Sequence, residues 1–133
     1  MTKLQYFSDL PKKEDIKWKK IINDVLEQLP KADREKIKKE CTVYCAYNKT
    51  GLCLFDTTKK VIILNCLQME ITYMPRWAKK HIVAHEFAHA CHGVKGIIDE
   101  DEDGAHALMN TWGFNKYENV YRAMKDSAVG AEQ

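Results

Sequence analysis

The chain of 133 residues is 45% hydrophobic and 30% charged, and its formal net charge is +2. These values predict one globular domain over residues 1–133 and exclude a separate substrate-recognition domain, for which too little chain is left. No apolar run has the length of a membrane-spanning helix, and residues 1–9 lack the apolar core of a secretion signal, so we expect a cytoplasmic protein without membrane contacts.

Charge and cysteine usage narrow the class of partner. Residues 1–40 carry 11 basic and 8 acidic side chains, residues 41–96 carry 7 and 3, and residues 97–133 carry 3 and 8. Lysine alternates with glutamate in the basic part, which is typical of solvated helix faces, so nucleic acid is not expected as a partner. The five cysteines form no C-x-x-C pair, and their odd number favours free thiols in a reducing compartment.

The first half of the chain predicts two helices followed by three strands. Pro11 to Leu29 carries an amphipathic stripe that ends at Pro30, and Ala32 to Lys39 predicts a short second helix. Strands are predicted where β-branched, aromatic and aliphatic residues stand between polar turns, over residues 41–47, 52–56 and 61–65. Such a meander predicts a small three-stranded antiparallel sheet.

The second half of the chain predicts helices. Pro75 suits the first turn of a helix, and Gly93 is the next glycine or proline along the chain, so we expect a helix over residues 75–92. An acidic segment then leads into a helix over residues 102–112, and a last helix is expected over residues 115–125. The predicted fold class is α+β: an N-terminal helix, the antiparallel sheet, and then helices.

Residues 85–89 read His-Glu-Phe-Ala-His, one copy of the pattern H-E-x-x-H. Residues four apart lie on one face of a helix, so His85 and His89 can present two imidazoles to one metal ion. Glu86 is turned by about 100° around the helix axis. From there it can reach a water on that metal without being a ligand. This is the layout of a zinc hydrolase.

A catalytic zinc ion takes three protein ligands and keeps its fourth position for water. Candidates for the third ligand lie in the acidic segment after the motif, although a run of carboxylates also suits the start of a helix. By residue type the choice stays open among Glu102, His106, Asp103 and Asp99.

The motif of residues 85–89, followed by Glu102 and by the small residue Ala105, resembles the gluzincin metallopeptidases, the thermolysin-like group. The resemblance covers mainly residues 60–114. The pairing of the motif with a downstream glutamate is similar to that in small single-domain members (minigluzincins) and in ImmA/IrrE-type proteases. It implies a zincin-like fold, Zn²⁺ as cofactor and Glu102 as third ligand. In the family, the position of His106 often carries an Asp or Asn that orients a zinc-bound imidazole. A histidine there departs from that pattern, so His106 either orients the imidazole or is itself the alternative ligand.

The same resemblance implies how a substrate binds. In such proteins an edge strand pairs with an extended peptide, and Val61 to Asn65 is provisionally assigned to that strand, with a buried strand that has no substrate role as the equal alternative. Four groups are available to stabilise the oxyanion, with the choice open: His106, Tyr73, Tyr117 and Tyr121. One turn before the motif, His81 is expected on the exposed polar surface, with a place in the cleft as the alternative.

Together these features predict a zinc metallopeptidase, a hydrolase that acts on a peptide or protein substrate with Glu86 as general base. The alternative is a zinc-binding regulatory or interaction protein with a zincin-like fold and little or no general proteolytic activity. Non-proteolytic hydrolysis at the same metal is a third possibility. Coordination separates the first two, because a closed four-ligand site is structural, whereas three ligands and a water are catalytic.

Overall fold

The computed structural model describes residues 3–47, 60–71, 73–92 and 102–114. The side chains of His92 and Glu102 lie outside that description. In chain order the elements are β1 (Gln5–Ser8), α1 (Lys12–Gln28), α2 (Lys31–Glu40), β2 (Cys41–Ala46), β3 (Lys60–Asn65), α3 (Cys66–Ile71), α4 (Arg76–His92) and α5 (Glu102–Thr111).

The three described strands form one sheet in the order β1-β2-β3, and both neighbouring pairs are parallel. The expected antiparallel sheet is therefore wrong. That expectation assumed that short turns join neighbouring strands, whereas parallel neighbours need a long crossover connection. Residues 47–59, which join β2 to β3, are numerous enough for one. The strand expected over residues 52–56 and the helix expected over residues 115–125 lie outside the described residues.

β2 lies in the centre of the sheet, and all six of its residues are buried. β3 is an outer strand of the described sheet and shows alternation instead. Its residues Ile62 and Leu64 are buried, whereas Ile63 is 45% exposed. This is the period of two expected when one face of an outer strand packs on the core and the other face does not.

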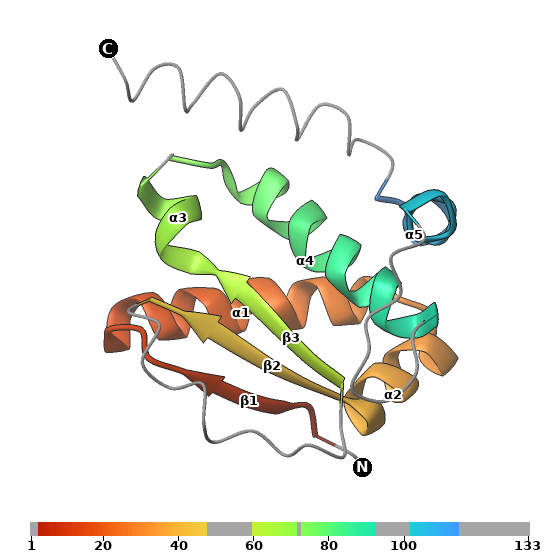
Figure 1. Ribbon diagram of the computed structural model, residues 1–133, viewed down its shortest axis with the longest axis horizontal. Coiled ribbons are helices and arrows are strands. Elements are labelled where there is room, and N and C mark those ends of the chain that lie inside the picture. The colour runs from red at the N-terminus through yellow and green to blue at the C-terminus, as the bar shows by residue number, and fades with distance from the viewer. Residues whose placement is uncertain (1–2, 48–59, 72, 93–101, 115–133) are drawn as a thin grey trace.

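Helices α1 and α4 cover one face of the sheet (Figure 1). The amphipathic stripe expected in the first helix is confirmed: its buried side chains are Trp18, Ile21, Ile22, Val25 and Leu26. These side chains share one apolar cluster with Val43 and Cys45 of β2 and with Val83 and Phe87 of α4. The chain turns sharply after α1, where Leu29 adopts an extended conformation. Pro30 imposes this, because the residue before a proline is disfavoured in the helical region.

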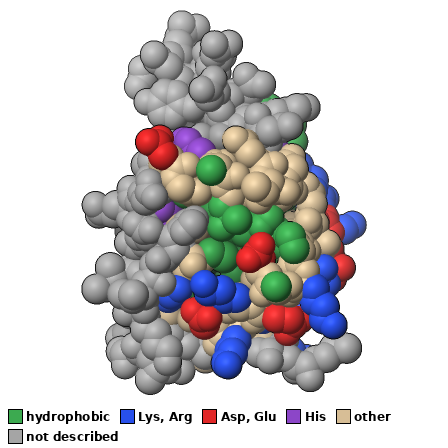
Figure 2. Space-filling model, turned by 90° about the vertical axis from the view of Figure 1, so that its right-hand side faces the viewer, with side chains coloured by type: hydrophobic (Ala, Val, Ile, Leu, Met, Phe, Trp, Pro, Cys, Tyr) green, Lys and Arg blue, Asp and Glu red, His purple; other side chains and the backbone are tan. Residues whose placement is uncertain are grey.

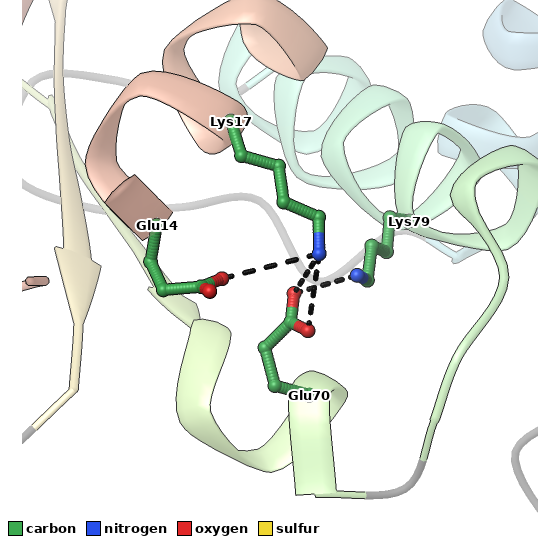
Figure 3. Close-up of polar contacts among 4 residues, drawn as sticks. All are labelled: Glu14, Lys17, Glu70 and Lys79. Atoms are coloured by element: carbon green, nitrogen blue, oxygen red, sulfur yellow. Dashed lines mark hydrogen bonds and ion pairs between the residues drawn. The ribbon is translucent and has the colours of Figure 1, made fainter. Parts of the chain in front are cut away.

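A charged network joins α4 to α1 and α3 (Figure 3). The Lys79 ammonium donates to the Glu70 carboxylate at 2.6 Å, and Lys17 reaches the same carboxylate at 3.3 Å. Lys17 also lies 3.9 Å from Glu14. Lys79 is only 4% exposed, and its Nζ lies 5.4 Å from the ring centroid of Trp18. A nearly buried ammonium thus depends on one carboxylate, which ties α3 to the amino-terminal half of α4.

The Glu70 carboxylate is held in its ionised form. Partial burial raises the pKa of this carboxyl, but the hydrogen bonds and charges of Lys79 and Lys17 outweigh burial and hold the pKa below its ordinary value. A lowered pKa in the folded state stabilises the fold above the pKa of the unfolded chain, about 4.3, and this contribution is lost as the pH falls through the folded-state value.

In the part of the chain that the structure describes, no helix combines the length and the apolar character that a membrane span requires.

We predict that Glu70→Gln lowers the free energy of unfolding by about 2 kcal/mol at pH 7, the typical value for hydrogen bonds to a charged group. Urea denaturation of both proteins between pH 7 and pH 3 is the measurement. The difference between them should be constant above about pH 5 and shrink as the solution is acidified. Glu27→Gln, at an exposed position of α1, is the matched control and should have little effect. A difference that grows on acidification would contradict this role of Glu70.

Candidate metal centre

The expected motif helix is confirmed as α4, which begins just after Pro75. The Pro75 carbonyl accepts hydrogen bonds from the backbone N–H groups of Ala78 and Lys79, each at 3.1 Å. Because the proline has no N–H to satisfy, it is well suited to this place. One side of the helix is apolar and fully buried, with Val83 and Phe87 both at 0% exposure.

A second side of α4 carries histidines at one-turn intervals. His81, His85 and His89 are 8%, 6% and 5% exposed. This spacing of four residues keeps the three rings on one helix face. The expectation that His81 lies on the exposed surface is therefore wrong. Since a carbonyl can only accept, the 2.8 Å contact to the Trp77 oxygen means that Nδ1 of His81 carries its proton.

The Nε2 atoms of His85 and His89 lie 3.1 Å apart, and the ring planes meet at 86°. Two nitrogen atoms bound to one tetrahedral zinc at 2.0–2.1 Å would be about 3.3 Å apart. The two imidazoles therefore fit a shared metal ion. The same separation also fits a hydrogen bond in which one imidazole donates to the other.

α5 brings a third histidine to this pair. The ring centroid of His106 lies 5.3 Å from that of His85, with the planes tilted by 48°. Close packing of α5 on α4 makes this approach possible, since Ala105 and Met109 are both fully buried. In Figure 2, histidine side chains are visible over a small area of the surface, near an acidic side chain. His106 itself is half-buried.

The described side chains do not complete a metal site. Among them, no group of three His, Cys, Asp or Glu residues is arranged to hold a metal ion. Position 102 begins α5 and lies one turn before His106, so the two positions share a helix face. The side chain of Glu102 is outside the described part, as is the whole of Asp99, and Asp103 is exposed. The choice of third ligand therefore stays a prediction.

The remaining candidates differ in their accessibility. Glu86 is half-buried, one residue after His85, so part of its side chain is open to solvent. Tyr73 is 87% exposed and has a positive φ of 53°. Tyr117 and Tyr121 lie outside the described residues, and the oxyanion-stabilising group stays unassigned.

The carboxyl-terminal end of α5 is held by a Schellman motif. Gly113 has a φ of 91°, and the N–H of Phe114 donates to the Met109 carbonyl at 2.9 Å while that of Gly113 donates to the Asn110 carbonyl at 3.1 Å. Glycine adopts this left-handed conformation without the penalty of a Cβ atom. The Trp112 indole N–H also donates to Asp33 of α2 at 2.9 Å. The helix that carries His106 is therefore anchored to α2.

No protein-family model, curated protein or solved structure matches this chain. The gluzincin resemblance thus stays a prediction, supported by the motif of residues 85–89 and by the geometry of α4 and α5.

We predict that the purified protein binds one zinc ion and that His85→Ala or His89→Ala removes this binding. Glu102→Ala should weaken zinc binding by about 100-fold or more, as expected for a direct ligand. His106→Ala should weaken it by about 10-fold to 100-fold, as expected for a residue that orients a ligand. Chelator competition measures the dissociation constants. Asp103→Ala, exposed and next to Glu102, is the matched control and should bind zinc normally. If neither Glu102→Ala nor His106→Ala weakens binding, both assignments are wrong.

Proposed function

We propose that this chain is a zinc-dependent peptidase. The observation that carries the proposal is the pair of buried imidazoles on one face of α4, with their Nε2 atoms 3.1 Å apart. Glu102 is proposed as the third ligand, because it begins the helix that packs on α4 and shares a face with His106. Glu86, in the same turn as His85, is proposed as the general base.

When bound at such a site, zinc lowers the pKa of a coordinated water toward about 7 and polarises the scissile carbonyl. The chain itself has to accept and return a proton. Glu86 accepts the proton of the attacking water and delivers it to the leaving amine nitrogen. Its position supports this role, since Glu86 is not fully buried and follows His85 directly on α4.

β3 is proposed as the strand that binds the peptide substrate. It is an outer strand of the described sheet, it contacts α4, and Ile63 on it is 45% exposed. An extended peptide that pairs with this strand gains backbone hydrogen bonds and runs alongside the helix that carries the metal ligands. The arrangement favours a peptide over a compact small molecule as substrate.

The second candidate is a zinc-binding regulatory or interaction protein with little general proteolysis. The histidine pair of α4 supports this candidate as well, because two imidazoles one helical turn apart also suit a structural zinc ion. A protein of this kind would bind zinc with a closed set of protein ligands and would hydrolyse no peptide.

We predict that Glu86→Gln binds zinc with an affinity within about twofold of the wild type but loses hydrolysis by a factor of at least about 100, the lower range for general base catalysis. Cleavage is followed by mass spectrometry on a denatured protein mixture, which offers many extended peptide sequences. Glu35→Gln, an exposed carboxylate on α2, is the control and should retain full activity. Full activity in Glu86→Gln would remove Glu86 from its role. Zinc binding by the wild type without any cleavage would favour the regulatory alternative.

A further inference from the structure

Two lysines from other elements bind the carboxyl-terminal end of α4. Lys36 of α2 donates to the Cys91 carbonyl at 2.9 Å, and Lys60 of β3 donates to the Ala90 carbonyl. The last four carbonyl groups of a helix have no partner within the helix, and the helix dipole makes this end negative. α4 ends at His92, so both of these carbonyls belong to that set.

Lys60 is an unusual residue for this task because it is only 2% exposed. Burial of an ammonium group is costly unless it is paired and hydrogen-bonded. Lys60 has both kinds of partner: the Ala90 carbonyl and the Glu40 carboxylate, 3.4 Å away at the end of α2. Lys60 also begins β3, where it pairs in register with Cys41. One buried charge therefore joins the sheet, α2 and the end of α4, where α4 ends close to the start of β3 (Figure 1).

The carbonyls that these lysines hold follow His89 directly in the chain. His89 stands in the last turn of α4, and helix ends fray unless their polar groups are satisfied. If that turn frays, His89 no longer lies one turn from His85 and the two Nε2 atoms separate. When only a fraction of the molecules is in the binding-competent state, the apparent affinity for a ligand is reduced to that fraction of its full value. Satisfied carbonyls at this end therefore favour the conformation that can bind a metal ion.

We propose that Lys36 and Lys60 are positioning residues of the metal centre, which keep His89 in register with His85 by holding the last turn of α4. This inference rests on the proposed function, because it assumes that the histidine pair binds zinc. Neither lysine contacts the metal or the substrate. Their effect is on the affinity and geometry of the metal site.

The test uses Lys60→Met, Lys36→Met and the control Lys39→Met in the full chain. Methionine keeps an unbranched stem of similar length and removes the charge and the donor. Lys39 is an exposed lysine of α2, and among the described residues it makes no hydrogen bond or ion pair to α4. Zinc dissociation constants are measured by chelator competition, the coordination geometry by the visible absorption of bound Co²⁺, and the stability of the zinc-free proteins by urea denaturation.

In the absence of denaturant, where Lys60→Met is folded, we expect it to bind zinc about tenfold more weakly than the wild type and to show an altered Co²⁺ spectrum. This factor is at the low end of that found for residues that orient a metal ligand directly. Lys36→Met should bind zinc about threefold more weakly, because its contact is exposed to solvent. Lys39→Met should match the wild type. Lys60→Arg, which retains a cation and N–H donors, should restore the wild-type Co²⁺ spectrum.

Zinc affinity and Co²⁺ spectra that stay at wild-type values in both methionine variants would overturn the proposal, even if the variants were less stable, and the proposed function would be unaffected. If Lys60→Met does not fold, Lys36→Met decides alone, and wild-type affinity there overturns the proposal. If the wild-type chain itself binds no zinc, this inference fails together with the proposed function.

Discussion

The candidate metal centre depends on one geometric constraint, the one-turn spacing of His85 and His89 on a helix that is buried on more than one side. Val83 and Phe87 place the apolar side of α4 in the core, and packing of α5 covers the side that carries the histidines. Polar rings are costly to bury unless they have partners. For the Nε2 atoms of His85 and His89, which lie 3.1 Å apart, one shared hydrogen bond or one metal ion meets that requirement.

The rest of the fold keeps this helix in place at both ends. In its first turn α4 presents Lys79, whose ammonium reaches the Glu70 carboxylate of α3 and lies over the ring of Trp18. At the carboxyl-terminal end of α4 the charges come from other elements, since Lys36 of α2 and Lys60 of β3 donate to the last carbonyls of the helix. The sheet contributes to this arrangement because it places the start of β3 near the end of α4. A lysine at the first position of that strand can therefore reach the Ala90 carbonyl.

Helices and strands with a strong local pattern could be predicted from the sequence. The stripe of α1, the proline before α4 and the glycine after α5 define these helices to within about two residues, the usual uncertainty of helix ends. Strand direction could not be predicted, because it depends on the path of the connection and not on the pattern within a strand. β1 has only four half-buried residues, and α3 has six that follow β3 without a break, so neither has a distinct pattern.

Only part of the candidate site could be predicted from the sequence. Spacing alone was enough to predict that His85 and His89 meet, and His106 was expected nearby. The buried lysine was missed, although Ile62 and Leu64 point to it: in a strand with alternate residues buried, Lys60 falls on the buried side. Burial of His81 was missed as well, because it results from the rings of Trp77 and Phe114, and Phe114 is distant in the sequence.

X-ray absorption spectroscopy of the zinc-loaded protein tests the central claim most directly, since it reports the atoms bound to the metal. We predict at least two imidazole nitrogen atoms at about 2.0–2.1 Å together with oxygen ligands in a four-coordinate shell. The imidazole signal should be lost when His85 and His89 are both replaced by alanine. A shell without imidazole, or one made of sulfur atoms, would contradict the claim that this pair of histidines is a metal centre.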